Sequence, residues 1–296
     1  MRRLAFILNP RSGKQHLRRS KAEILADLLA EYPERHDVFE THYAGHAAKL
    51  SAEAAAGGYD VVVAYGGDGT INEVARGLVG SACALGIIPA GSGNGMAHGL
   101  GIPSRPRRAL EVITSAPIRK IDVGRVNGDC FFNVFGLGFD AALAERFHRE
   151  AGGVRGALPY FTLGIKTFLR YQPPPISYEI DGERIEVEPL TLAVANGPEY
   201  GTGARIAPEA DFSDGWLDIV LLPRMPALRA ALALPRLFNG TVARVREREH
   251  RRAKRLSIHV PPDTPVHFDG EARTCSGTLD IWVEPGALAV VAPTPG

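Results

Sequence analysis

The sequence predicts an α/β domain followed by a mostly antiparallel β domain. Residues 1–122 alternate short apolar runs with amphipathic segments, an order typical of a parallel sheet with helices on both faces. Residues 123–296 instead hold many short apolar runs that are separated by turn residues. A chain of 296 residues is long enough for two such domains. The sequence leaves open whether the last strand returns to the first domain.

Strands and helices are expected to alternate in the first domain. The spacing of Ile24, Leu25, Leu28 and Leu29 places their side chains on one side of a helix. A glycine pair at 57–58 is typical of the end of a second helix. The expected order is strand 3–10, helix 16–32, strand 36–41, helix 45–58, strand 60–67, helix 70–80 and strand 84–91.

Turn dipeptides organise the second domain. Asn127-Gly128 and Asp181-Gly182 each separate two apolar runs, which predicts a tight β-hairpin at both places. Helical segments are expected between 141 and 171, ahead of three consecutive prolines. Further short strands are predicted at 190–197, 216–223, 255–262, 265–272 and 278–292.

The bulk composition favours a soluble, cytoplasmic protein. The net charge is +1, so no overall field directs the chain to nucleic acid or to a membrane. Cys83, Cys130 and Cys275 lack a metal-binding spacing, and the histidines form no zinc motif. The most apolar segment, 225–238, is interrupted by charges and is too short to span a bilayer. We therefore expect a cytoplasmic protein that is able to rest on the inner membrane face.

The segment Gly66-Gly67-Asp68-Gly69-Thr70 follows an apolar run and precedes an amphipathic one. Such a turn presents backbone N–H groups at a helix N-terminus, where the helix dipole favours a bound phosphate. Asp68 fits this site if a Mg²⁺ ion mediates, or if its carboxylate accepts hydrogen bonds from a ribose or a backbone group. The alternative is a plain strand-to-helix turn with an N-cap residue.

Two further strand ends carry similar residues. In a parallel sheet consecutive strand ends lie along one edge, which is where α/β proteins bind ligands. The spacing of the glycines matches neither a P-loop nor a Rossmann fingerprint. The pattern therefore predicts one phosphate-binding edge. Besides residues 66–70, this edge is expected to contain Gly91, Ser92, Gly93 and Asn94 after one strand, and Asn9, Ser12 and Gly13 after another.

Four motifs in this order resemble the diacylglycerol kinase catalytic-domain family: NPRSGK, GGDGTINEV, PAGSGNGMAHGLGIP and HFDGEA. That family includes bacterial lipid kinases, sphingosine kinases and ceramide kinases, whereas NAD kinases share GGDGT alone. The resemblance implies an α/β nucleotide domain of the NAD-kinase/phosphofructokinase type and a β-sandwich-like lipid domain. It also implies an enzyme that uses Mg²⁺ and transfers the γ-phosphate of ATP to a lipid hydroxyl.

The resemblance assigns roles to particular residues. Asp211, Asp214 and Trp216 lie in a segment that resembles the family's Mg²⁺-binding turn, with Asp214 contributing its carboxylate and the region of the other two contributing main-chain oxygens. A polar turn before a strand is the alternative. The implied nucleotide contacts are Asn9, Ser12, Gly13, Thr41, Gly66, Gly67, Asp68, Gly69, Thr70, Asn72, Glu73, Gly91, Ser92, Gly93 and Asn94.

The resemblance also implies that Asp269 and Glu271 are catalytic, together with Asp68. Phosphorylation of a hydroxyl needs a base, or an oriented acceptor, beside the γ-phosphate. Which acid takes the proton stays open, and an Asp-Gly hairpin turn is the alternative. The implied wall of the acceptor site comprises Phe135, Phe139 and Asp140, for which an apolar core strand is the alternative.

The acceptor and the partners are less determined. A diacylglycerol-like acceptor is expected, and phosphatidylglycerol or a sphingoid base is the alternative, because Gly95 stands where many bacterial members carry aspartate. The basic run Arg244–Arg255 fits a solvated face or a transient contact with anionic lipid headgroups. No nucleic acid is expected, because no aromatic residues interleave the arginines. A homodimer stays open, as do two rival functions: a soluble-substrate kinase of the NAD kinase type and a nucleotide-binding regulator without turnover.

Overall fold

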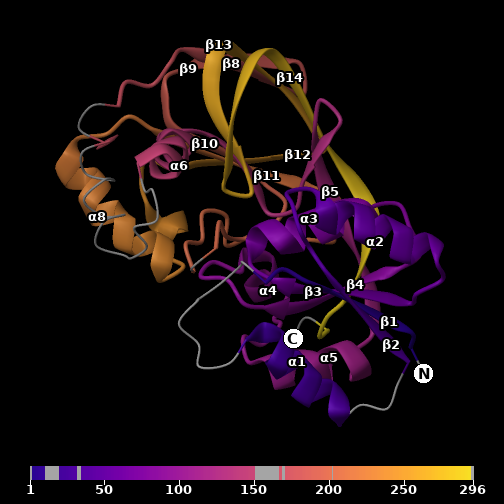
Figure 1. The fold of residues 1–296 in the computed structure, drawn as a ribbon. Coiled ribbons are helices and arrows are strands. Elements are labelled where there is room, and N and C mark those ends of the chain that lie inside the picture. The colour runs from indigo at the N-terminus through magenta and orange to yellow at the C-terminus, as the bar shows by residue number, and fades with distance from the viewer. Residues whose placement is uncertain are drawn as a thin grey trace. The chain divides into compact units, whose positions relative to one another are not determined.

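The computed structural model describes residues 2–10, 20–31, 35–150, 167–168, 171–201 and 203–294. The chain divides into two compact units (Figure 1). The first unit comprises Met1–Asp122 with Pro285–Gly296, and the second unit comprises Val123–Glu284. Strands β5 (Ile118–Val126) and β14 (Glu271–Val291) each carry the chain from one unit into the other.

The first unit is a parallel sheet covered by helices. Its strands lie in the order β4–β3–β1–β2, and the C-terminal part of β14 runs parallel to β4. This confirms the predicted alternation of strands and helices. The elements are β1 (Leu4–Leu8), α1 (Lys21–Ala30), β2 (His36–Glu40), α2 (His46–Ala56), β3 (Val61–Gly66), α3 (Asp68–Leu78), β4 (Ala84–Pro89), α4 (Gly95–Gly99) and α5 (Pro106–Ser115).

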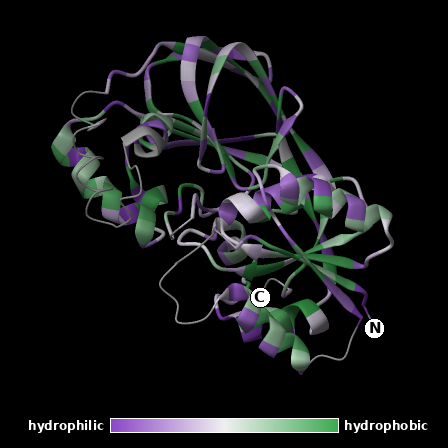
Figure 2. Cartoon of the chain, viewed as in Figure 1, coloured by the Kyte–Doolittle hydropathy of each residue, from purple (hydrophilic) through white to green (hydrophobic). Residues whose placement is uncertain are grey.

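The central strands of this sheet are buried along their whole length. Strands β1, β3 and β4 consist almost entirely of apolar residues, as expected where helices cover both faces of a parallel sheet (Figure 2). Helices α2 and α3 pack closely on each other at Gly77. A Cβ atom there would lie 2.1 Å from the Ser51 hydroxyl oxygen and 2.3 Å from the Ala48 carbonyl oxygen, so this contact requires glycine.

The second unit is built on an antiparallel sheet. Its strands follow the order β12–β11–β10–β7–β13–β14, while β8 pairs with both β13 and β9. Its elements besides β5 and β14 are β6 (Asp129–Phe131), β7 (Val134–Gly138), α6 (Phe139–Glu150), β8 (Ile176–Ile180), β9 (Glu183–Val187), β10 (Pro189–Ala195), β11 (Leu217–Pro223), α8 (Ala227–Phe238), the 3₁₀-helix η1 (Val242–Arg244), β12 (Glu249–Ala253) and β13 (Arg255–Phe268).

Both predicted hairpins are present in the second unit. Strands β5 and β6 turn at Asn127-Gly128, where φ is 49° and 95°. Strands β8 and β9 turn at Asp181-Gly182, where φ is 53° and 82°. Positive φ at both central positions defines the type I′ turn that matches the twist of a hairpin.

The middle of the basic run Arg244–Arg255 forms a strand, which the sequence pattern did not predict. Its residues Glu249–Ala253 form the strand β12, which pairs with β11. The register places Arg252 opposite Asp218, and such a cross-strand charge pair supports a strand that has little apolar content. Among the described residues, none of the helices has both the length and the apolar character needed to cross a membrane.

Candidate functional site

Three loops meet at the carboxyl edge of the first unit's sheet. The strands β1, β3 and β4 are parallel and in register up to their ends, so the residues that directly follow them are neighbours. The Asn9 side chain after β1 donates from Nδ2 to the Thr70 hydroxyl at 3.1 Å. The structure thus brings two of the sequence-predicted residues together, while Ser12 and Gly13 lie outside the described residues.

The glycines of this edge allow the two loops after β3 and β4 to touch through their backbones. A Cβ atom on Gly91 would lie 2.7 Å from the Cα atom of Gly67, and one on Gly66 would lie 2.5 Å from Thr70 Cβ. The Ala90 N–H donates to the Gly66 carbonyl at 2.7 Å. Larger residues at these positions would therefore push the two loops apart.

Asp68 joins the two loops. Its two carboxylate oxygens accept the backbone N–H groups of Asn94 and Gly95, each at 2.8 Å. Asp68 is also the first residue of α3, where a negative charge is favourable. Of the alternatives that the sequence left open for this acid, the structure bears out acceptance of backbone hydrogen bonds.

The carboxylate of Asp68 also fits a Mg²⁺ ion that arrives with a nucleotide. Each of its oxygens accepts one backbone donor and retains a lone pair. The described residues contain no group of three His, Cys, Asp or Glu side chains that would form a complete metal cage. Magnesium commonly binds one or two carboxylates and completes its shell with substrate phosphates and water, which is the donor set available at Asp68.

Asn94 shapes the second glycine loop. Its amide oxygen accepts the Gly91 N–H and its amide nitrogen donates to the Gly91 carbonyl, both at 2.9 Å. The residue has a φ of 55°, a left-handed conformation that asparagine tolerates better than most residues. The loop leaves Ser92 exposed, while a Cβ atom on Gly93 would lie 2.5 Å from the Asp68 carboxylate.

The remaining predicted nucleotide residues have varied surroundings. Gly69 is exposed in the first turn of α3, whereas Asn72 is buried in that helix. The Glu73 carboxylate accepts the Ala47 N–H at 3.1 Å, which caps the first turn of α2. Thr41 follows β2, and its N–H donates to the Leu8 carbonyl at 2.9 Å.

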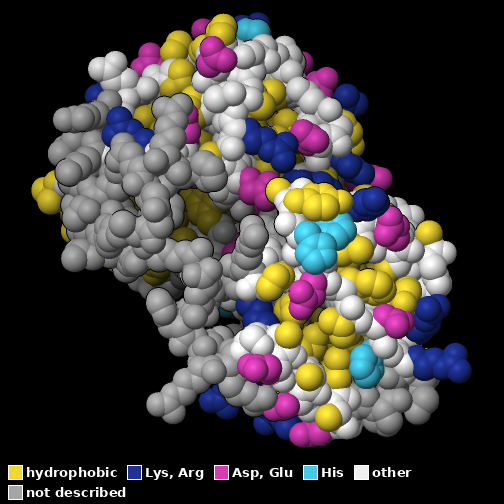
Figure 3. All heavy atoms as spheres, in the orientation of Figure 1, with side chains coloured by type: hydrophobic (Ala, Val, Ile, Leu, Met, Phe, Trp, Pro, Cys, Tyr) yellow, Lys and Arg dark blue, Asp and Glu magenta, His cyan; other side chains and the backbone are white. Residues whose placement is uncertain are grey.

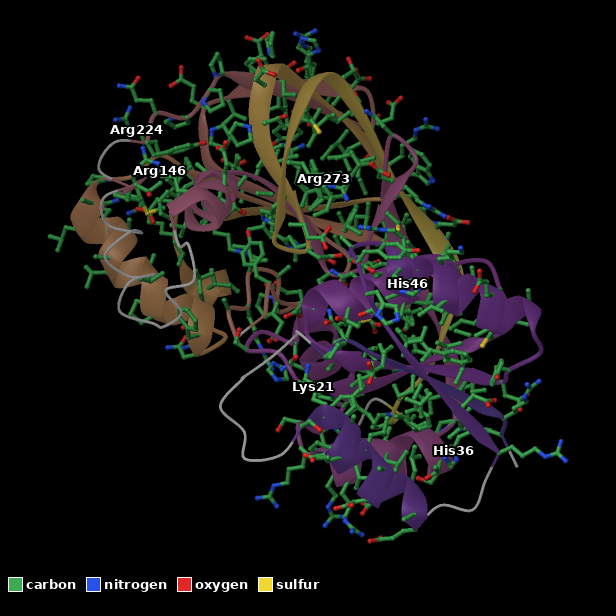
Figure 4. The ribbon with its side chains drawn as sticks, viewed as in Figure 1. Lys21, His36, His46, Arg146, Arg224 and Arg273 are labelled. Atoms are coloured by element: carbon green, nitrogen blue, oxygen red, sulfur yellow. The ribbon has the colours of Figure 1, made fainter. Side chains whose placement is uncertain are left out.

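Lys21 is a residue of this edge that the sequence argument missed. It is the first residue of α1, is only 9% exposed, and donates from Nζ to the Asn9 carbonyl at 2.8 Å (Figure 4). Burial lowers the pKa of Lys21 to about 8. A cation at a helix N-terminus is unfavourable because it opposes the helix dipole. An anion bound beside Lys21 would offset this effect and favour the charged form of the side chain. Its place directly after the Ser20 cap of a capping box was the available signal.

Asp269 lies at the tip of the β13–β14 hairpin. Asp269 and Gly270 have φ values of 51° and 84°, and Phe268 pairs with Glu271 on either side of them. The Asp269 carboxylate accepts three backbone N–H groups, at 2.7 to 3.0 Å, from the residues Phe132, Asn133 and Val134. Burial raises the pKa of Asp269, and these three donors oppose that effect. Its oxygens therefore hold the turn in place.

Glu271 is the more accessible acid of the DGE triplet. It is the first residue of β14, and its side chain is 40% exposed. The Arg273 guanidinium lies 3.7 Å from its carboxylate. A carboxylate at this position is able to meet a ligand without loss of the hydrogen bonds that shape the turn at Asp269.

A hydrogen-bonded cluster of side chains supports the turn at Asp269 and Gly270. The Gly270 N–H donates to His267 Nδ1 at 3.3 Å, so the proton of this buried imidazole resides on Nε2. That Nε2 lies 3.1 Å from the Asp140 carboxylate, which also accepts the Tyr200 hydroxyl at 2.8 Å. Asp140 thus connects the start of α6 to the DGE turn through His267.

The two phenylalanines implied for the acceptor wall differ in their surroundings. Phe135 is fully buried in the core of the second unit and packs edge-on against Phe268, so the core-strand alternative describes it. Phe139 packs edge-on against Phe168 and Tyr171, with ring centroids at 5.6 and 6.0 Å. These two rings line a cavity of about 380 Å³ in the second unit, so Phe139 supports the wall of this cavity.

The acids of the turn that resembles a Mg²⁺ site have protein partners in this structure. Asp214 accepts the Trp216 N–H with one oxygen and forms an ion pair with Arg252 through the other. Asp211 accepts the N–H and the hydroxyl of Ser213. The Arg252 guanidinium also lies over the Trp216 ring. An arginine thus pairs with the carboxylate that the ion would need, and the metal role of Asp211, Asp214 and Trp216 stays a prediction.

Several arginines of the basic run form ion pairs in the folded protein. Arg248 pairs with Glu209, and Arg251 pairs with Glu183, while Arg252 is engaged by Asp214 as described above. Arg251 and Arg252 are neighbours on β12, so the alternation of side chains along the strand places them on opposite faces. The run accordingly forms several separate ion pairs within the second unit.

Comparison with known protein families matches both halves of the chain. Residues 3–126 match the diacylglycerol kinase catalytic domain, and residues 133–292 match the YegS C-terminal NAD kinase beta sandwich-like domain. A diacylglycerol kinase of Mycobacterium tuberculosis is 34% identical over 87% of this chain and 84% of the relative. A probable lipid kinase, YegS-like, of Pseudomonas putida is 35% identical over 85% of this chain and 83% of the relative.

Solved structures give the same result for the fold. A putative diacylglycerol kinase from Bacillus anthracis superposes with a TM-score of 0.77 at 26% identity, covering 100% of this chain and 99% of the other. An NAD kinase from Archaeoglobus fulgidus, solved with ATP, has a TM-score of 0.51 at 11% identity over 97% of this chain and 93% of its own, a likeness of fold alone. The chain therefore belongs to the family of diacylglycerol kinases and YegS-like lipid kinases.

Proposed function

We propose that this protein transfers the γ-phosphate of ATP to a hydroxyl group of a membrane-derived lipid, with a diacylglycerol-like lipid as the preferred acceptor. The observation that carries the proposal is the Asp68 bridge between the two glycine loops. It fixes converging backbone N–H groups and a carboxylate at one sheet edge, which are the parts that bind a metal–triphosphate. Family membership supports the lipid acceptor.

The first unit would hold the nucleotide. Backbone N–H groups of the two glycine loops would donate to the phosphate oxygens, and the Asn9 side chain would border them. The Lys21 ammonium would add a cation at the same edge. Mg²⁺ bound with the nucleotide would supply further positive charge beside Asp68. Catalysis of phosphoryl transfer relies mainly on such positioning and charge neutralisation.

The second unit would supply the base and the acceptor site. We assign the base to the Glu271 carboxylate, which accepts the proton of the lipid hydroxyl, because the Asp269 oxygens are committed to three backbone N–H groups. We assign the lipid acceptor to the cavity behind Phe139, which is lined by aromatic and aliphatic residues and by one arginine, Arg224. The protein would act in the cytoplasm and meet this lipid at the membrane surface.

A radiolabel assay tests the proposal. The purified protein is incubated with γ-labelled ATP, Mg²⁺ and one acceptor at a time: diacylglycerol, phosphatidylglycerol, sphingosine, ceramide or NAD. Label on a lipid in the organic phase is the expected result, with diacylglycerol the best acceptor. Label on NAD alone would contradict the proposal in favour of a soluble-substrate kinase. Tight ATP binding without any transfer would favour a nucleotide-binding regulator.

A further inference from the structure

Helix α8 exposes an apolar face that the fold of the second unit does not use. Of the eight large hydrophobic side chains exposed among the described residues, half lie on this helix. They are Leu228, Leu232, Leu234 and Phe238, with exposed fractions of 75%, 67%, 42% and 56%. None of the twelve residues of α8, all of which the structure describes, is buried. A few hydrophobic side chains are visible at the left edge of Figure 3, where this helix lies in Figure 1.

The helix contacts its own unit along the opposite side. Ala230, Ala233 and Leu237 are partly covered, and their spacing of three and four residues forms one stripe along the helix. Leu237 packs against a buried cluster of the second unit. At 3.6 residues per turn, Leu228 and Leu232 fall on the face away from this stripe. Two alanines and Leu237 therefore attach the helix, and Leu228 and Leu232 point outwards.

Cations border the outward apolar face. The helix and its flanking residues contain three arginines and no acidic residue. Arg229 forms an ion pair with Glu247, and Arg236 donates to the Arg244 carbonyl, so both guanidinium groups are held beside the helix. Arg224 is exposed just before the helix begins (Figure 4). An apolar helix face that is flanked by arginines is typical of a helix that lies in the surface of an anionic membrane.

We propose that α8 docks the second unit on the surface of an anionic lipid bilayer, with Leu228, Leu232 and Phe238 entering the interface. The inference rests on the proposed function, because a lipid acceptor has to be taken from a bilayer. A second copy of the chain fits less well, since a symmetric pair of α8 helices would bring like charges together. Residues 224–227, which lead into the helix, line the cavity assigned to the acceptor, so docking would place that cavity beside the bilayer.

Vesicle co-sedimentation tests the docking surface. The double variant Leu228→Ser/Leu232→Ser is compared with wild type and with Val38→Ser, a matched control that changes an apolar residue exposed by 45% on β2 of the first unit. Wild type and control are expected to bind vesicles of mixed phosphatidylglycerol and phosphatidylcholine. The double variant is expected to bind them at least about tenfold more weakly, since two leucines no longer enter the interface. All three proteins are expected to melt alike, because the changed side chains are exposed.

Lipid charge and oligomeric state complete the test. Wild type is expected to bind pure phosphatidylcholine vesicles more weakly than the anionic ones, and equal binding to both would contradict the role of the arginines. Undiminished binding by the double variant would overturn the proposal. So would a wild-type dimer that the double variant converts to a monomer, if wild type did not bind vesicles.

An activity assay separates this inference from the proposed function. The double variant is expected to phosphorylate a dissolved short-chain diacylglycerol at the wild-type rate and to lose activity towards long-chain diacylglycerol in vesicles. Equal activity of both proteins on vesicle lipid would contradict docking through α8. Failure of wild type to phosphorylate the dissolved lipid would instead contradict the proposed function, and the sedimentation result would still decide the docking role.

Discussion

Replacement of Asp269 by asparagine is expected to reduce stability more than catalysis. The Asp269 carboxylate accepts the N–H groups of Phe132, Asn133 and Val134 at 2.8, 2.7 and 3.0 Å. An asparagine keeps one acceptor oxygen and turns an NH₂ group towards a remaining donor. One unsatisfied donor costs about 1–3 kcal/mol, and the weakening of two charge-assisted bonds adds about 0.5 kcal/mol each. The sum of about 2–4 kcal/mol corresponds to a melting temperature lower by about 5–15 °C.

Replacement of Glu271 by glutamine is expected to have the opposite effect. This side chain is 40% exposed at the start of β14, so the melting temperature should change little. Loss of a base should lower kcat by a factor of about 10²–10⁴ and leave the affinity for ATP unchanged. Asp181→Asn is the matched control, because Asp181 has a φ of 53° at the tip of another type I′ hairpin.

Thermal melting and kcat of labelled phosphate transfer, measured on all three variants, decide between the two acids. The reasoning would be refuted if Asp269→Asn melted like wild type and lost kcat, since Asp269 would then be the base. Full kcat in Glu271→Gln would remove the role assigned to Glu271. A large loss of stability in Asp181→Asn would show that the turn conformation, and not the three hydrogen bonds, governs the effect.

Three further predictions concern charged groups. Asp68→Ala should abolish turnover and weaken ATP binding, measured by calorimetry, because it releases the second glycine loop; near-normal turnover would contradict this. Lys21→Met should weaken ATP binding about tenfold while raising the stability of the nucleotide-free protein at pH 7, because a buried charged lysine destabilises the fold. The destabilisation by charged Lys21 is complete below its folded pKa of about 8 and disappears as the pH rises towards its ordinary pKa of 10.5. Urea unfolding should therefore show a smaller difference in stability between Lys21→Met and wild type at pH 10 than at pH 7. An equal difference at both pH values would contradict the predicted pH dependence. EDTA should leave the melting temperature of the nucleotide-free protein unchanged, because Arg252 pairs with Asp214; a drop that Mg²⁺ reverses would instead support a metal ion at this turn.

The elements of the fold follow from short-range patterns in the sequence. Apolar runs such as Val61–Gly66 carry their strand signal locally, and the Asn127-Gly128 dipeptide specifies a type I′ hairpin by its own conformational preference. The strand β12 could not be predicted in this way. Its residues Glu249–Ala253 are mostly charged, and they form a strand because β11 offers a pairing edge with Asp218 opposite Arg252.

The sequence motifs predict which residues form the candidate site, but they do not predict the role of each residue. The glycine clusters locate the sheet edge because parallel strand ends lie side by side. The role of Asp269 depends on backbone donors more than 130 positions away, at Asn133 and its neighbours, which no local pattern reveals. Lys21 looked like one of many basic residues, and only the fold shows that it is buried beside Asn9. The pairing of Asp214 with Arg252 likewise requires the strand register.

We propose that this chain phosphorylates a lipid hydroxyl with ATP and that Glu271 takes the proton. The most direct test of this proposal is the transfer of label from γ-labelled ATP to a dissolved short-chain diacylglycerol, followed by chromatography of the organic phase, with ATP binding measured on the same preparations. We predict labelled phosphatidic acid from wild type and almost none from Glu271→Gln, although both proteins bind ATP equally. No labelled lipid from an ATP-bound wild type, or equal label from the variant, would contradict the account.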